Sequence, residues 1–107
     1  MMTDQCRALL RELRSALGAV YGARLQHLVL YGSQARGDAD ASSDIDVLVV
    51  LQGPVRAGEE SARTSPLTAQ LSLSSDVVIS CVFMALDRFQ EQQSPLLLNV
   101  RREGIAF

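Results

Sequence analysis

The run of residues 45–51 constrains the fold more than any other feature of the chain. It reads Ile-Asp-Val-Leu-Val-Val-Leu, so only Asp46 interrupts a row of apolar side chains. A strand with one solvated face alternates apolar and polar residues, whereas a near-continuous apolar run is typical of a strand buried on both faces. We therefore expect this strand to lie inside a sheet that is covered on both sides.

Two elements are predicted before this strand. Residues 3–21 favour a helix, because apolar residues recur at spacings of three and four and Thr3 can cap the first turn. Residues 25–31 form an apolar run rich in strand-forming residues, and Gly32 ends it abruptly. The expected order is thus a helix and a strand, followed by a polar segment that leads into the central strand.

The second half of the chain is less regular. Residues 55–74 favour short helical turns that Pro66 either interrupts or restarts, and residues 76–83 are predicted as a third strand that begins at Asp76. Two further helices are expected over residues 86–92 and 94–103. This order of elements predicts one compact α/β or α+β domain that spans residues 1–107.

Composition narrows the classes of protein to consider. The chain has 107 residues, of which 48% are hydrophobic and 21% charged, as expected for a globular domain. The net charge of −2 argues against strong direct binding of nucleic acid. All ten basic residues are arginines, so chemistry that needs a lysine nucleophile or a lysine-bearing P-loop is excluded.

The remaining signals concern redox state and location. Cys6 and Cys81 lie far apart and His27 is the only histidine, which offers neither a disulfide framework nor the spacing of a zinc site. The first residues lack the pattern of a signal peptide, and no apolar run approaches the roughly 18 residues of a membrane span. We therefore expect a cytoplasmic protein without membrane contact.

Chemistry-bearing residues gather after the first strand. Gly32 has no Cβ, so its backbone can approach a ligand closely, and Ser33 can cap a short helix whose N–H groups cradle phosphates. The same Gly-Ser pair is also typical of an ordinary turn. By itself it leaves both interpretations open.

Acidic residues supply a second signal. Asp44 and Asp46 lie two apart at the start of a strand, so their side chains share a face. Paired carboxylates repel unless a cation holds them, and they suit the Mg²⁺ ions that support phosphoryl or nucleotidyl transfer. A solvated loop edge is the alternative. Asp76 can complete a three-carboxylate site as ligand or general base if its strand lies beside the central one; otherwise it marks an exposed strand end.

The combined pattern resembles the signature of the minimal nucleotidyltransferases of the DNA polymerase β superfamily. Gly32-Ser33 is followed after ten residues by Asp44-x-Asp46, with Ala35-Arg36-Gly37 and Ser43 between. The segment from Ser94-Pro95 to Ile105 is similar to the tail of those short proteins. The resemblance includes the first helix, the motif, Asp76 and the tail, and it covers residues 55–74 poorly.

This resemblance implies a fold, a reaction and a set of site residues. The fold would be a small mixed sheet flanked by helices. Gly32 and Ser33 would bind the β- and γ-phosphates of ATP, and Arg36 would reach the phosphates unless it forms a surface ion pair. Asp44, Asp46 and Asp76 would hold two Mg²⁺ ions. An acceptor hydroxyl would attack the α-phosphate and release pyrophosphate.

The resemblance also implies a partner. Larger members of the superfamily carry an extra acceptor-binding domain, for which 107 residues leave no room. Short proteins of this kind resemble the antitoxins paired with HEPN-domain ribonuclease toxins, in which AMP is transferred to a tyrosine of the toxin. A type VII-like antitoxin, in an oligomer with itself or with its toxin, is therefore expected. The alternatives are an antitoxin that acts by contact alone and a nucleotidyltransferase for small molecules such as aminoglycosides.

Overall fold

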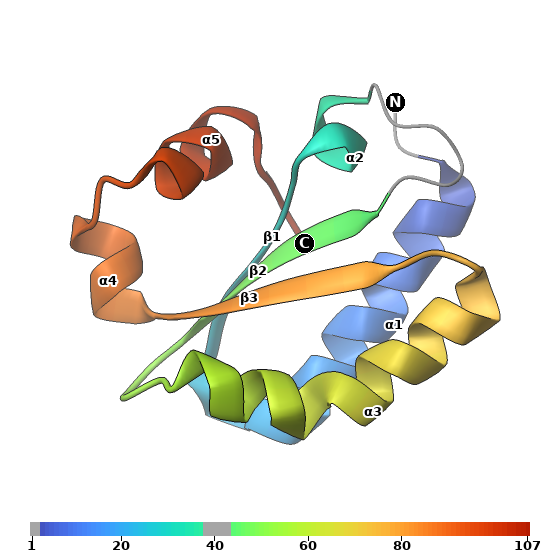
Figure 1. The fold of residues 1–107 in the computed structure, drawn as a ribbon, viewed down its shortest axis with the longest axis horizontal. Helices are drawn as coiled ribbons and strands as arrows, with labels where there is room; N and C mark the ends of the chain where they lie inside the picture. The colour runs from blue at the N-terminus through green and yellow to red at the C-terminus, as the bar shows by residue number, and fades with distance from the viewer. Residues whose placement is uncertain (1–2, 38–43) are drawn as a thin grey trace.

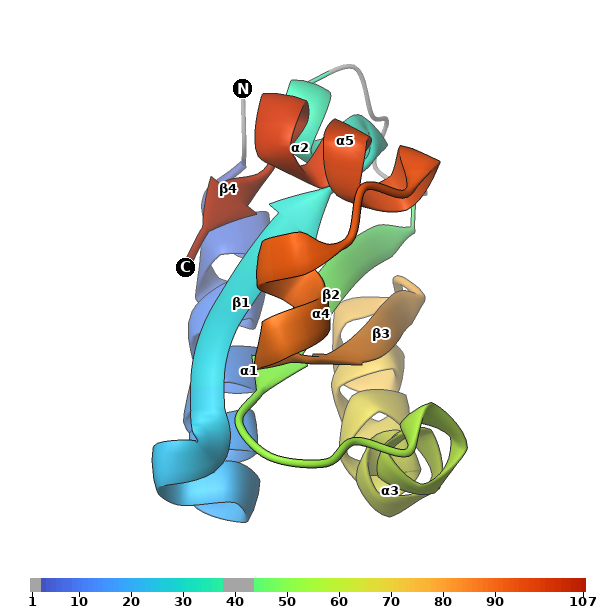
Figure 2. The ribbon, with the colours of Figure 1, turned by 90° about the vertical axis from the view of Figure 1, so that its left-hand side faces the viewer.

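The computed structural model describes residues 3–37 and 44–107. Its elements, in chain order, are α1 (Asp4–Tyr21), the 3₁₀ helix η1 (Gly22–Arg24), β1 (Leu25–Tyr31), α2 (Ser33–Arg36), β2 (Ile45–Leu51), α3 (Ala57–Ser75), β3 (Ile79–Ala85), α4 (Leu86–Glu91), α5 (Pro95–Glu103) and β4 (Ile105–Ala106). The strands form one sheet of order β3-β2-β1-β4 (Figures 1 and 2). β2 is parallel to β3, whereas β1 is antiparallel to β2 and β4.

Helices cover both faces of this sheet. α1 and α3 lie on one face, and α4 and α5 lie on the other (Figures 1 and 2). Alternate residues of β2 point into the two layers: Val47 and Val49 join the cluster with α1, and Leu48 and Val50 join the cluster with α5. The strand buried on both faces and the mixed sheet flanked by helices are thus confirmed.

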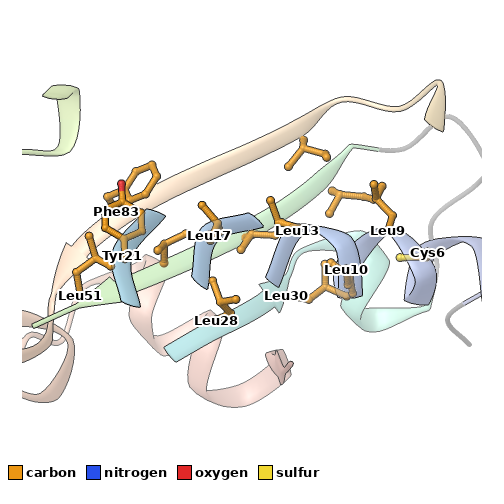
Figure 3. Packing of buried hydrophobic residues seen from close by; sticks show 14 residues of the cluster. Cys6, Leu9, Leu10, Leu13, Leu17, Tyr21, Leu28, Leu30, Leu51 and Phe83 are labelled. Carbon is orange, nitrogen blue, oxygen red and sulfur yellow. The ribbon is translucent and has the colours of Figure 1, made fainter. Parts of the chain in front are cut away.

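Helix α1 has the N-terminal cap and the apolar stripe that its sequence predicts. The Thr3 side chain accepts a hydrogen bond of 3.1 Å from the Cys6 N–H and caps the first turn. Leu9, Leu13 and Leu17 form part of a buried stripe that packs against the sheet (Figure 3). The helix ends at Gly22, whose positive φ of 55° a glycine adopts without strain.

α3 differs from the expectation for this region. It is one continuous helix that keeps Pro66 on its exposed side. The residues facing inward are Glu60, Thr64, Leu67 and Leu71, which follow helical spacing. Half of this stripe is polar, so hydrophobic periodicity could not reveal it. Packing against α1 and β3 overrides the preference of proline to interrupt a helix.

The third strand begins later than predicted. α3 runs to Ser75, and Asp76 closes it in a left-handed conformation with φ of 56° while its N–H donates to the Ser72 carbonyl. β3 therefore starts at Ile79, and the prediction that Asp76 begins this strand is wrong. The short strand β4, which the sequence did not indicate, pairs with Val29 and Leu30 of β1. In the described part of the chain, no helix has both the length and the apolar character that a membrane crossing requires.

A buried carboxylate joins α1 to α3. Glu60 is 4% exposed, and its Oε1 accepts hydrogen bonds from the Tyr21 hydroxyl at 2.8 Å and from Arg63 Nε at 2.9 Å. Burial alone would raise the pKa of Glu60, but these two hydrogen bonds and the charges of Arg63 and Arg24 outweigh it, so the pKa is lowered. A lowered folded-state pKa stabilises the protein at neutral pH, and this stabilisation is lost as the pH falls through that pKa.

We expect Glu60→Gln to lower the free energy of unfolding by about 1–3 kcal/mol at neutral pH, because the charged acceptor of two hydrogen bonds is lost. The difference from the native protein should shrink as the pH falls through the lowered pKa of Glu60, where Glu60 itself becomes protonated. Urea denaturation across this pH range measures both effects. Glu59→Gln, which removes an exposed carboxylate beside Arg56, is the control. If Glu60→Gln and Glu59→Gln lost the same free energy of unfolding, the burial of Glu60 would not explain its effect on stability.

Candidate functional site

The pairing of β1 with β2 brings the sequence motif together at one end of the sheet. Tyr31, the last residue of β1, is the register partner of Asp46, near the start of β2. Gly32 follows Tyr31 and leads into the short helix α2, which lies beside this end of the sheet (Figure 1). The Gly-Ser pair and the Asp-x-Asp pair, separated by ten residues in sequence, therefore meet.

Gly32 passes directly over the Asp46 carboxylate. A Cβ built on Gly32 would lie only 2.7 Å from Asp46 Oδ2, closer than real Cβ contacts allow. The backbone at Gly32 has φ of 76° and ψ of −157°, a region that only glycine readily adopts. Gly32 is also the N-cap of α2 and Ser33 is its first residue, so the expectation that Ser33 caps this helix is wrong.

The two aspartates of the motif interact. Asp44 is exposed immediately before β2, and Asp46 is half-buried in its second position. The pKa of Asp46 is raised, first by burial and second by the negative charge of Asp44. Asp46 lies on the same face as Leu48 and Val50, which is the face covered by α4 and α5.

Tyr31 is a neighbour that the sequence did not single out for this site. It is half-buried, and its pKa is raised by burial, by the charge of Asp46 and by Cys81, in that order of importance. The antiparallel register predicts this proximity, because directly opposed residues project to the same face. Only the sheet pairing could have revealed it.

The third acidic group was expected beside Asp46, but the structure places Ser80 there and Asp76 elsewhere. In the parallel register of β2 and β3, the partner of Asp46 is Ser80. Asp76 is exposed at the end of α3, before β3 begins. Within residues 3–37 and 44–107, no three His, Cys, Asp or Glu side chains come together as a metal site. The role of Asp76 as a third ligand stays a prediction.

Arg36 is tied to the opposite end of the chain. Its Nη1 lies 3.2 Å from Glu103 Oε2, which joins α2 to the last turn of α5. The sequence left open whether Arg36 reaches phosphates or forms a surface ion pair, and the described structure contains the ion pair. Both side chains are partly exposed, so the pair itself contributes little to stability.

The donor set at Asp44 and Asp46 fits a divalent cation. Both groups are carboxylates, the hard oxygen ligands that Mg²⁺ prefers, and the pKa of Asp46 is raised by burial and by repulsion from the charge of Asp44. Protonation of Asp46, which its raised pKa favours, is one way to relieve this repulsion, and a bound cation is the other. The described residues supply two carboxylates for this purpose, and a hydroxyl, Ser80, beside them.

Comparison with known proteins adds a family and several relatives. Residues 7–96 match the family model described as "Nucleotidyltransferase domain". A protein of Methanocaldococcus jannaschii named "putative protein adenylyltransferase" is 29% identical over 72 residues, which are 67% of this chain and 72% of that protein. A second protein of that organism, with the same activity in its name, is 44% identical over 41 residues, which are 38% of this chain and 41% of its own length.

Solved structures share the fold. A "putative nucleotidyltransferase" from Sulfolobus solfataricus has a TM-score of 0.68 at 19% identity, covering 96% of this chain and 81% of that chain. A chain from a toxin–antitoxin crystal structure with AMP-PNP has a TM-score of 0.64 at 19% identity, covering 97% and 72%. A chain from a complex of tri-AMPylated Shewanella oneidensis HEPN toxin with MNT antitoxin has a TM-score of 0.54 at 16% identity, covering 92% and 70%.

We expect Gly32→Ala to displace the Asp46 carboxylate, since the new methyl group and Oδ2 cannot occupy their present positions together. Gly53→Ala is the matched control, because Gly53 also has a positive φ, of 90°, but has open space around it. Each variant should lose about 1–3 kcal/mol of stability through backbone strain. Only Gly32→Ala should shift the carboxyl carbon resonance and the pKa of Asp46 in an NMR titration. Equal Asp46 resonances in the two variants would contradict the close approach.

Proposed function

The chain belongs to the nucleotidyltransferase domain family, and from this premise we propose that it transfers AMP from ATP to a hydroxyl group of a partner protein. The observation that carries the proposal is the passage of Gly32 over the Asp46 carboxylate, with Asp44 beside it. This arrangement puts an open backbone next to paired cation ligands, as transfer from a nucleoside triphosphate requires. The names of the two archaeal relatives support protein adenylylation in particular.

The residues of the motif then have distinct roles. Gly32 and Ser33 bind the β- and γ-phosphates of ATP, and Arg36 turns from Glu103 toward the phosphates when the nucleotide binds. Asp44 and Asp46 would hold Mg²⁺. When bound, Mg²⁺ ions neutralise phosphate charge and polarise the α-phosphate. Asp76 remains the proposed third acidic residue, although it does not join the other two in a described cluster.

The proposed reaction is an in-line displacement at the α-phosphorus. The acceptor oxygen forms a bond to the α-phosphorus of ATP, and the bond from that phosphorus to the bridging oxygen breaks. Pyrophosphate leaves, the acceptor carries AMP, and the hydroxyl proton passes to a carboxylate or to solvent. The Asp44–Asp46 pair orients the nucleotide for this attack, and the glycine turn holds the leaving phosphates in line.

The proposed acceptor is a tyrosine of a HEPN-domain toxin, and the chain then acts as an antitoxin. Support comes from fold neighbours that include a toxin–antitoxin pair with AMP-PNP and an AMPylated HEPN toxin with its MNT antitoxin. We also propose that residues 1–107 form a single domain. Its two cores are built on the two faces of the same sheet, so they do not divide into separate units.

One observation favours a second candidate function, neutralisation of the partner by contact alone. Because no cluster of three acidic residues occurs among the described residues, the chain can keep the fold without a complete set of metal ligands. The paired carboxylates argue for chemistry, since a pure binding protein gains nothing from the repulsion between Asp44 and Asp46. The experiment that follows separates the two functions.

We expect the copurified partner, incubated with the chain, ATP and Mg²⁺, to gain the mass of one AMP group at each modified site. Asp44→Asn should reduce the rate by roughly 100-fold or more, because charge on the transferring phosphate is no longer balanced. Asp87→Asn, which changes an exposed aspartate on α4, is the control. Protection of the partner without an adduct would support contact alone. An adduct on an aminoglycoside, and none on the protein, would support a small-molecule enzyme.

A separate prediction concerns the position opposite Asp46. Ser80→Asp should tighten Mn²⁺ binding on the order of tenfold, because a third carboxylate adds ligand charge to the pair. Ser80→Asn, of similar size and without charge, should leave it unchanged. Electron paramagnetic resonance of Mn²⁺ measures the affinity without reference to activity. An unchanged affinity in Ser80→Asp would show that position 80 does not face the cation site.

A further inference from the structure

A stripe of arginines lies on the exposed side of α1. Arg7, Arg11 and Arg14 follow one another at spacings of four and three, so their side chains leave the same side of the helix. All three are exposed, and within residues 3–37 and 44–107 none of their guanidinium groups has a hydrogen-bond or ion-pair partner. In a chain with a net charge of −2, this is a local concentration of positive charge.

The stripe borders a hollow with an apolar floor. The three arginines, Leu10, Ile105 and Phe107 line a cavity of about 460 Å³ between α1 and β4. Ile105 is 38% exposed, although it is a large apolar residue. A smaller hollow of about 170 Å³ adjoins it, shares Arg14 and Phe107 with it, and extends to Gln26 and His27 of β1. We call the larger cavity, which Ala106 also lines, the α1–β4 groove.

The sheet has an open edge beside this groove. Among the described residues, β4 pairs only with Val29 and Leu30 of the longer strand β1, and the Phe107 N–H adds one hydrogen bond of 3.0 Å to the Leu28 carbonyl. Figure 2 shows the short β4 beside the end of β1, with α1 behind both. In the described part of the chain, residues 25–27 of β1 have no strand partner on this side. Unpaired backbone groups at a sheet edge are a template for an added strand.

We propose that the α1–β4 groove docks an extended acidic segment of a partner protein. The open edge supplies backbone hydrogen bonds to the segment, and every second side chain of the segment projects to the α1 side. The carboxylates on these side chains pair with the arginines, and their aliphatic stems lie on the apolar floor. Arginine suits this role because its guanidinium group binds a carboxylate through two parallel hydrogen bonds. The inference goes beyond AMP transfer, since Asp46 lies on the opposite face of the sheet from α1.

A protein segment fits the groove better than a nucleic acid does. The floor offers aliphatic side chains and a single aromatic ring, Phe107, for contact. Binding of single-stranded nucleic acid relies instead on several stacking aromatic residues along a basic channel. The net charge of −2 also opposes a long polyanion, whereas it has little effect on a short acidic segment held by three arginines.

The test uses a fluorescein-labelled peptide of alternating valine and glutamate, and the same peptide with lysine in place of glutamate. Fluorescence anisotropy should show binding of the glutamate peptide to the full chain. Reversal of two charges, Arg11→Glu with Arg14→Glu, should weaken that binding at least roughly tenfold and create binding of the lysine peptide. Arg88→Glu, an exposed arginine on α4, is the control and should change neither affinity.

Several results would overturn the inference. They are equal binding of both peptides, equal binding by the charge-reversed variant, or a single-stranded RNA that binds more tightly with the same dependence on Arg11 and Arg14. Conversion of a dimer to a monomer by the double variant would assign the groove to a second copy of this chain. Circular dichroism confirms that the exposed substitutions leave the fold intact. The assay contains no ATP, so its outcome is independent of AMP transfer.

Discussion

The antiparallel pairing of β1 with β2 is the constraint on which the candidate site depends. It sets Tyr31 opposite Asp46, so the chain that leaves β1 at Gly32 turns over the Asp46 carboxylate. A register shift of one residue would move Asp46 to the face covered by α1 and α3, where it would be buried without a partner. The chemistry proposed for this protein is therefore inseparable from a particular strand alignment.

The apolar character of β2 secures that alignment. Val47 and Val49 are fully buried in the layer with α1, and Leu48 and Val50 are fully buried in the layer with α5, so neither face tolerates a shift. Charge is confined to the first residues of the strand, where Asp46 is only half-buried. The conformation of Gly32 that only glycine readily adopts, and the repulsion between Asp44 and Asp46, thus occur at the end of an element whose core is strongly stabilised.

The candidate catalytic site and the proposed docking groove lie on different faces of the sheet. Asp46 and Tyr31 lie on the side of α4 and α5, whereas the α1–β4 groove lies on the side of α1. If both proposals hold, this separation would let an acceptor protein be held at one surface while a nucleotide is bound at another. Ser80 is the register partner of Asp46. Family membership follows from the whole domain, whereas metal affinity depends on individual ligands such as these.

The sequence by itself determined the central strand and the first helix, because hydrophobic periodicity is a local signal, and it supplied the Gly-Ser and Asp-x-Asp motif. Only the register of β1 with β2 decided that Gly32 meets Asp46. The sequence did not determine α3, since Glu60 and Thr64 occupy half of its inward stripe, nor β4, which is too short to have a period. The sequence predicted that Asp76 begins a strand. In the structure Asp76 ends helix α3, and Ser80 is the register partner of Asp46. Register between distant strands decides which side chains become neighbours, and that register results from packing of the whole domain.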